Sequence, residues 1–270
     1  MYRIKDYTFK SFKTIANLHK SNYAVLENET SLGIKYCPHM SFDGEFRILH
    51  QLDQKQIPKV YDYGQGTMYK DKEVVLTQYF IVLDHTSDID LVGYFQEKMA
   101  EDFSSQIKNI IECYISVCDP LDYLHSKNLI HCDIKPGHIM IDPDTNTTYL
   151  IDFELAIRKA DIIKGISMDY ASPEQIDLLH NLRNQPENIP LEAISFFLSL
   201  DDKTDIYSTG AVMYETLTKQ KWKDSKIPPR DINRLIPQKL EDVIMASLEE
   251  DPSNRIATAK QLKQSLQNLL

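Results

Sequence analysis

The sequence has few of the features that mark membrane, disulfide-bonded or zinc-binding proteins. No run of about 18 apolar residues occurs in the 270-residue chain, so we expect no membrane-spanning helix. The first residues, MYRIKDYTFK, are charged and contain no apolar segment, so we expect no signal peptide. The four cysteines form no CxxC pair, which argues against a zinc site or a disulfide framework. We therefore expect reduced thiols in a cytoplasmic protein, and delivery into another cell stays open.

Basic residues are few relative to acidic ones. The chain has 30 Lys and Arg residues against 40 Asp and Glu residues, a formal net charge of −10. Nucleic-acid-binding domains usually show the opposite balance, so we expect no nucleic-acid partner and no membrane partner. The apolar fraction of 42% is ordinary for a folded protein, and the length suits one large domain or two closely joined lobes.

Runs of β-branched and aromatic residues separated by polar turns dominate the first part of the chain. They predict strands at residues 12–18, 22–28, 31–37, 57–66 and 74–85. We expect the Gly64-Gln65-Gly66 segment and the following MYKDKE to form the turn between the last two.

Helical spacing appears at residues 43–52 and again, over a longer stretch, at Ser105–Leu124. Two short strands then follow, HIMID and TYLIDF, joined by the turn-rich PDTNT. These patterns predict an α+β fold with a small β-rich N-terminal lobe at 1–84 and a larger, mostly helical C-terminal lobe at 91–270. We expect the two lobes to be joined by residues 85–90.

Polar residues are concentrated in one stretch, LIHCDIKPGHIMI, which runs from Leu129 to Ile141. On a loop, Asp133 can accept a hydrogen bond from an attacking hydroxyl, and Lys135 can offset the charge of a transferring phosphate. Asp152, in the later YLIDFELA, offers the hard oxygen ligand that Mg²⁺ prefers. The stretch therefore has the residue types of a phosphoryl-transfer site.

The order of these motifs resembles that of the eukaryotic-type protein kinases. HCDIKPGH and DFE stand where that family has H-R-D-x-K-P-x-N and D-F-G. Other segments that resemble family landmarks, in the family's order, are GIK at 33–35, EFRIL at 45–49, SPE at 172–174, TDIYSTG at 204–210 and DPSNRIAT at 251–258. The resemblance covers roughly Phe12 to the C-terminus, and Lys135 resembles the serine/threonine branch.

The resemblance implies a bilobal kinase fold that transfers phosphate from ATP to Ser or Thr hydroxyls of a protein substrate, with Mg²⁺ or Mn²⁺. It assigns catalysis to Asp133 and Lys135 and the metal to Asp152 and His138. It assigns the nucleotide to Lys35, Glu45, Val25, Leu83 and Asp84.

The same resemblance implies structural roles. We expect His131 to be packed beside Phe153, and Asp205 to bury its carboxylate against backbone N–H groups of the catalytic loop. We also expect an ion pair between Arg255 and Glu174, and a hydrogen bond between Ser167 and either Asp133 or Lys135.

Several residues depart from the family pattern. No glycine-rich loop is present, because its place reads His19-Lys20-Ser21-Asn22. His138 replaces a metal-binding Asn, and it could ligate Mn²⁺ or instead hydrogen-bond Asp133. Glu154 replaces the glycine of D-F-G, where it could add a metal ligand or restrict the backbone.

Cys132 replaces the arginine that grips an activation-loop phosphate in many kinases. We therefore expect activity to be independent of activation-loop phosphorylation. Residues 175–204 are more numerous than the family places there, and they form either an extra helix or a docking surface for a partner. Two other functions stay open: a pseudokinase that binds nucleotide or protein as a scaffold, and a kinase-fold enzyme with another acceptor.

Overall fold

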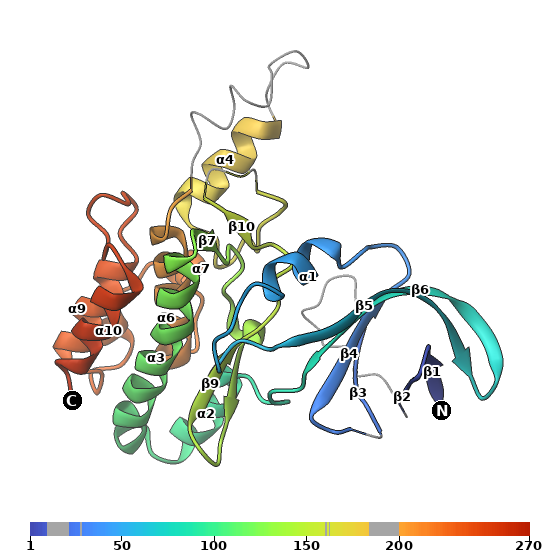
Figure 1. Ribbon diagram of the computed structural model, residues 1–270. Helices are drawn as coiled ribbons and strands as arrows, with labels where there is room; N and C mark the ends of the chain where they lie inside the picture. Colours follow the sequence, from blue (N-terminus) through green and yellow to red (C-terminus); the bar gives the residue numbers. More distant parts are fainter. Residues whose placement is uncertain (10–21, 28, 160, 162, 184–199) are drawn as a thin grey trace. The chain divides into compact units, whose positions relative to one another are not determined.

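The computed structural model describes the chain except for residues 10–21, 28, 160, 162 and 184–199 (Figure 1). It divides into two compact units, Met1–Ser87 and Asp88–Leu270, and the boundary lies within the segment that we expected to join two lobes. The elements of the first unit are β1 (Tyr2–Ile4), β2 (Tyr7–Phe9), β3 (Asn22–Val25), β4 (Leu32–Cys37), α1 (Asp43–Leu49), β5 (Val60–Lys70) and β6 (Glu73–Asp84).

The first unit is built on a six-stranded antiparallel sheet with the order β2-β1-β5-β6-β4-β3. The β5–β6 hairpin turns at Asp71 and Lys72, both of which have positive φ angles, as a tight hairpin turn requires. The turn predicted over Gly64–Gly66 and MYKDKE is therefore confirmed in its second part, which contains Asp71 and Lys72, and wrong in its first, because Gly64–Gly66 pair with β6 inside the hairpin.

The glycine at position 66 has a packing reason instead. A Cβ atom there would lie 3.0 Å from Cγ2 of Ile4, so a side chain at this position would crowd the close approach of β1. The β1–β2 hairpin was not predicted from the sequence, and the predicted strand at 12–18 lies outside the described residues.

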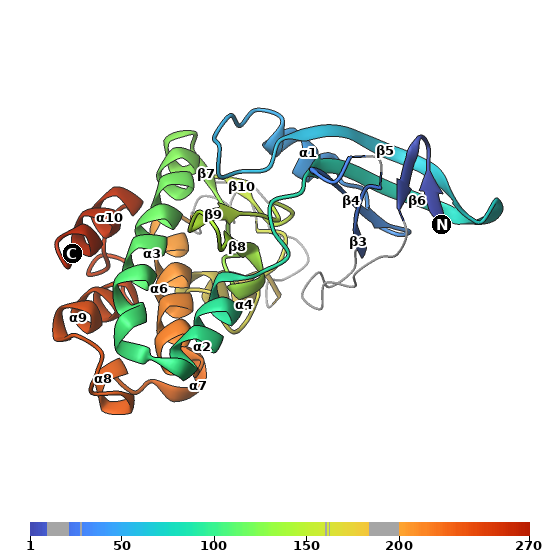
Figure 2. The same cartoon turned by 90° about the horizontal axis from the view of Figure 1, so that it is seen from below.

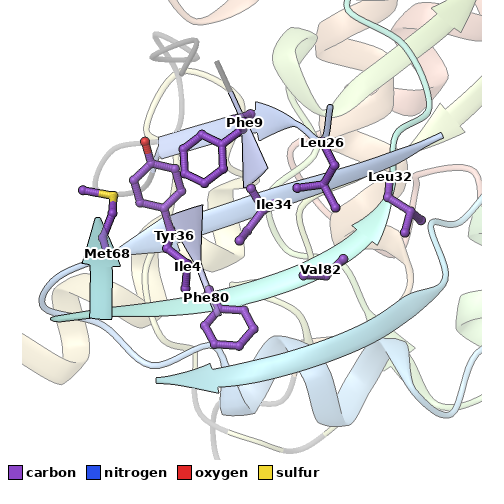
Figure 3. Close-up of a cluster of buried hydrophobic side chains, with 10 residues drawn as sticks. Ile4, Phe9, Leu26, Leu32, Ile34, Tyr36, Met68, Phe80 and Val82 are labelled. Atoms are coloured by element: carbon purple, nitrogen blue, oxygen red, sulfur yellow. The ribbon is translucent and has the colours of Figure 1, made fainter. Parts of the chain in front are cut away.

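One face of this sheet carries the hydrophobic core of the first unit (Figure 3). Alternate residues of neighbouring strands supply it, as the period of two in a strand requires. Its buried members are Ile4, Phe9, Ala24, Leu26, Leu32, Ile34, Tyr36, Met68, Phe80 and Val82. The intervening residues of β3, β4 and β6 therefore point to the opposite face of the sheet.

The second unit is mostly helical, with short strands that hold the polar stretch in place (Figures 1 and 2). Its first elements are α2 (Leu91–Glu101), α3 (Phe103–Ser126), β7 (Leu129–Ile130), the 3-10 helix η1 (Pro136–His138), β8 (Ile139–Asp142), β9 (Thr147–Leu150) and β10 (Ile157–Arg158). They are followed by α4 (Pro173–Arg183), α6 (Lys203–Thr218), α7 (Trp222–Ser225), α8 (Pro229–Ile232), α9 (Gln238–Ser247) and α10 (Ala259–Gln267).

The predicted helix at Ser105–Leu124 lies within α3, which packs against α10 and α2 (Figure 2). In the described part of the chain, no helix combines the length and the apolar character needed to cross a membrane. Most of the extra segment at 175–204 lies outside the described residues, so its prediction stays open.

Candidate active site

The loop after β7 is held by the buried carboxylate of Asp205, which comes from the first turn of α6. Its two oxygens accept the backbone N–H groups of His131 and Cys132, each at 2.9 Å. The ring of His125 contacts the same carboxylate at 2.8 Å. Burial alone would raise the pKa of Asp205, but the hydrogen bond and charge of His125 and the backbone donor hold it below its ordinary value. The predicted role of Asp205 is confirmed by these contacts.

His131 is fully buried, and both of its ring nitrogens are satisfied. Nε2 lies 3.1 Å from the carbonyl oxygen of Ile151, which can only accept, so Nε2 carries the proton. Nδ1 then accepts the backbone N–H of Asp133 at 3.3 Å. Burial holds the pKa of His131 below its ordinary value, which agrees with a neutral ring. The ring packs edge-on against Phe153 at 4.8 Å, so this histidine is structural, as predicted.

The loop after β7 places a carboxylate beside an ammonium, and the ammonium also reaches a hydroxyl from a later segment. Lys135 Nζ donates to Oδ2 of Asp133 at 2.9 Å and to Oγ of Ser167 at 3.1 Å. Pro136 favours an extended backbone in the residue before it, and Lys135 accordingly has a φ of −155° and a ψ of 168°. Oδ1 of Asp133 is buried and has no hydrogen-bond partner among the described residues. That oxygen is therefore left as an acceptor for a hydroxyl.

The β8–β9 hairpin brings His138 to Asp152. Ile139 pairs with Leu150, and the next residue, Ile151, donates its N–H to the carbonyl of His138 at 3.0 Å. The chain thus returns beside η1, and Nε2 of His138 lies 3.2 Å from Oδ2 of Asp152. Asp152 has a φ of 63°, a strained left-handed conformation that recurs at functional sites.

The tautomer of His138 follows from its neighbours. Nδ1 lies 2.8 Å from the carbonyl oxygen of Asp133, so Nδ1 carries a proton. In a neutral ring, Nε2 then has a lone pair and can only accept. It faces a carboxylate oxygen of Asp152, which is also an acceptor, and it has no hydrogen-bond partner among the described residues. Two acceptors at this distance require a shared proton or a cation. The side chain of His138 is 2% exposed, so water does not relieve the pairing.

These two residues therefore fit a divalent cation. Within the described residues, no group of three or more His, Cys, Asp and Glu side chains could hold a metal ion by itself. Mg²⁺ is often held by only one or two carboxylates together with substrate phosphates and water, so a complete protein cage is not needed. Glu154 contributes its backbone to the site, because its N–H lies 3.4 Å from Oδ1 of Asp152.

In the first unit, Lys35 and Glu45 form a buried ion pair. Lys35 Nζ donates to Oε2 of Glu45 at 2.9 Å, although only ten residues separate them in the sequence. β4 places Lys35 on the sheet, and α1 places Glu45 in its first turn. The side chains are 4% and 3% exposed, respectively, so the pair holds the lysine in one extended position.

The other predicted nucleotide residues are strand residues near Lys35. Gly33 pairs with Val25 on one side and with Leu83 on the other. Asp84 comes next on β6, and its carboxylate accepts the N–H of Lys59 and the hydroxyl of Tyr61, both at 2.8 Å. The structure therefore gathers Val25, Leu83 and Lys35 around Gly33, and it engages the side chain of Asp84 elsewhere. The predicted loop residues His19 and Lys20 lie outside the described residues.

The segment after Asp152 packs on an apolar cluster at the position of the missing arginine. Cys132 is 3% exposed in this cluster, and burial raises the pKa of its thiol. The buried members are Ile130, Cys132, Ile157, Ile163, Leu178 and Leu200. Next to Ile163, Lys164 Nζ donates to the carbonyl oxygens of Glu154 and Ala156, each at 3.1 Å. The contacts around Cys132 and Lys164 are thus apolar or go to backbone carbonyls, and an ion pair between Lys159 and Asp202 at 2.8 Å adds to them.

The end of this segment is held by an ion pair that the sequence predicted. Arg255 donates to both oxygens of Glu174, at 2.7 and 3.1 Å. Two further contacts were not predicted from the sequence. Gln175 donates to the carbonyl oxygen of Cys132 at 2.9 Å, and His125 contacts Asp205. The signal for His125 was its place in the last turn of an apolar helix, where a buried imidazole needs an acidic partner.

The geometry of both units agrees with the comparison with known families. The protein kinase domain family matches residues 19–269, nearly the whole chain. The chain therefore belongs to the protein kinase family.

Individual relatives agree with this assignment. A probable serine/threonine-protein kinase of Clostridium acetobutylicum is 25% identical over an alignment of 282 positions, which covers 97% of this chain and 37% of that protein. One of Clostridium perfringens is 28% identical over 211 residues, covering 70% of this chain and 27% of that protein. The chain thus spans only 37% of the length of the first relative and 27% of the length of the second.

A solved structure shows the same fold. The kinase PK-1 of the Cydia pomonella granulovirus aligns with a TM-score of 0.65 at 17% sequence identity. The alignment covers 95% of this chain and 92% of that chain. The predicted fold class, a bilobal α+β protein-kinase-like fold, is confirmed.

Proposed function

We propose that this chain transfers the terminal phosphate of ATP to serine or threonine hydroxyls of a protein substrate. The carboxylate of Asp133 is the observation that supports this most directly. One oxygen is bound by Lys135, and the other is a buried acceptor with no hydrogen-bond partner among the described residues. An acceptor hydroxyl that donates to this second oxygen would be oriented for attack, with Lys135 close enough to offset charge on the phosphate.

The metal in this proposal is held by Asp152 and His138, and it would offset the negative charge of the phosphates when bound. An imidazole nitrogen suits Mn²⁺ better than Mg²⁺, which prefers oxygen ligands. His138 presents Nε2 toward Asp152 in a fixed orientation, because Nδ1 is held by the carbonyl of Asp133. We therefore expect Mn²⁺ to support the reaction better than Mg²⁺.

The proposed activity does not depend on activation-loop phosphorylation. The apolar cluster around Cys132 and the two hydrogen bonds of Lys164 occupy the place where an arginine and a phosphate would hold the segment. Treatment with a phosphatase is expected to leave activity unchanged, and loss of activity after such treatment would contradict this part of the proposal.

The test is phosphate transfer from labelled ATP to a generic basic protein, with Mg²⁺ or Mn²⁺. Transfer by the purified chain is expected, and it should disappear in Asp133→Ala and in Asp152→Ala. His180→Ala, on the exposed face of α4, is the matched control and should retain activity. No transfer with either metal by a folded protein would overturn the proposal.

A second candidate is a pseudokinase that binds nucleotide without turnover. It is favoured by the close contact between His138 and Asp152, because a proton shared between them would fill the place of the metal. ATP that raises the thermal unfolding midpoint, without any transfer, would identify this second function.

A further inference from the structure

Tyr23 covers Gly33 on the face of the sheet that carries Lys35. A Cβ atom on Gly33 would overlap the hydroxyl and the ring edge of Tyr23, so the aromatic ring lies directly against the glycine. The Tyr23 hydroxyl lies 3.0 Å from Nδ1 of His85, just beyond the end of β6. The two rings are 6.0 Å apart at 34°. The side chain of Tyr23 is therefore held across the strands at both its ring and its hydroxyl.

The strand registers show that this face is the one predicted to take the nucleotide. Tyr23 pairs with Lys35, and Val25 pairs with Gly33. Since Ala24 and Ile34 belong to the core on the opposite face, these four residues share the other face.

Gly33 lies at the centre of the predicted nucleotide residues. It pairs with both Val25 and Leu83 and stands two positions from Lys35, a distance of roughly 7 Å along a strand. A nucleotide that contacts all three of these residues must pass over Gly33. The ring of Tyr23 occupies that position.

We propose that Tyr23 is a gate on nucleotide binding, closed over Gly33 by its hydrogen bond to His85 and displaced when a nucleoside triphosphate binds. This inference rests on the proposed ATP-dependent function. Glycine at position 33 is required by the closed state, since any side chain there would push the ring away. Because only the open fraction of molecules can bind, closure lowers the apparent affinity for nucleotide in proportion to that fraction.

The test measures binding of a non-hydrolysable ATP analogue with Mn²⁺ by calorimetry. Tyr23→Phe keeps the ring and removes the hydrogen bond, so its affinity should rise by about three- to tenfold. Tyr23→Val removes the ring as well, suits a strand, and should bind at least as tightly as Tyr23→Phe. Tyr69→Val is the control and should bind as the wild type does, because Tyr69 pairs with Arg3 of β1 and β6 separates its strand from β4.

Gly33→Ala provides a second measurement through the same contact. With Tyr23 present, the new methyl group should expel the ring and raise the affinity. In the Tyr23→Val background, the same change should have little effect. Such non-additivity is expected only if the two residues act through one contact.

The outcomes separate the gate from the proposed function. Equal or weaker binding by both Tyr23 variants would overturn the gate while leaving ATP binding in place. Weaker binding would mean that the ring of Tyr23 contacts the adenine base and supports binding. If neither the folded wild type nor Tyr23→Val binds nucleotide, both the gate and the ATP-dependent function fail. Binding by Tyr23→Val alone would support the gate in its strongest form.

Discussion

At the scale of single residues, the site depends on which hydrogen-bonding group faces which. His131 and His138 lie close in sequence, and a backbone carbonyl fixes the tautomer of each ring. The remaining nitrogen of His131 finds a donor, whereas that of His138 faces a carboxylate. The same residue type is therefore structural at one position and a candidate ligand at the other, and sequence could not separate the two for position 138.

Replacing His138 by asparagine should shift the metal preference toward Mg²⁺, because an amide oxygen replaces an imidazole nitrogen. We expect the ratio of Mg²⁺-supported to Mn²⁺-supported phosphate transfer to rise on the order of tenfold. Nucleotide binding titrated with each metal gives a readout that does not depend on turnover. An unchanged ratio in a folded variant would argue that His138 does not touch the metal.

Replacing Asp205 by asparagine should destabilise the second unit. The carboxylate accepts two backbone N–H groups and contacts His125, while an amide offers one acceptor oxygen in place of two. A buried N–H left without an acceptor costs about 1–3 kcal/mol, so we expect a loss of roughly 3 kcal/mol in the free energy of unfolding. Urea denaturation of this variant, compared with the surface control Asp231→Asn, measures the loss.

At the scale of elements, patterning predicted what local sequence controls. The β-rich run of β4 and the apolar stripe of α3 are local sequence patterns, and both elements lie where they were expected. The predicted β5–β6 turn was too long, because Gly64–Gly66 belong to the paired strand, where Gly66 packs close to Ile4 of β1. The contact of Tyr23 with Gly33 was missed for a similar reason, since it depends on strand register and not on spacing within one segment.

Lys164 is an exposed side chain that helps to hold the segment after Asp152. Replacing Lys164 by methionine removes both hydrogen bonds to the carbonyls of Glu154 and Ala156 and keeps most of the side-chain length. We expect phosphate transfer to a protein acceptor to slow by about fivefold, since each exposed hydrogen bond contributes on the order of 0.5 kcal/mol. Steady-state kinetics should show that Lys164→Arg retains more activity, and Lys108→Met on α3 is the control. Full activity in Lys164→Met would show that the apolar cluster alone holds the segment.

At the scale of the whole molecule, long-range ion pairs tie together segments that patterning treats separately. The side chain of Arg255 is fully buried. It forms an ion pair with Glu174 at the start of α4 and donates a hydrogen bond to the carbonyl of Lys203 at the start of α6. The family resemblance predicted this pair, whereas composition and periodicity contain no information about it. The positions of motifs thus located contacts between distant segments that local propensity could not.

This ion pair gives a prediction for the pH dependence of stability. Burial would raise the pKa of Glu174, but the hydrogen bonds and charge of Arg255 hold it below its ordinary value of 4.5. Because the unfolded chain binds the proton more readily, this contribution is present above pH 4.5 and is lost as the pH falls through the lowered pKa. Glu174→Gln leaves Arg255 buried and unpaired, so we expect it to unfold roughly 3 kcal/mol more easily at neutral pH. In urea titrations repeated at decreasing pH, the difference between wild type and variant should shrink below pH 4.5. A difference that stays constant across this range would mean that the charge of Glu174 contributes nothing to stability.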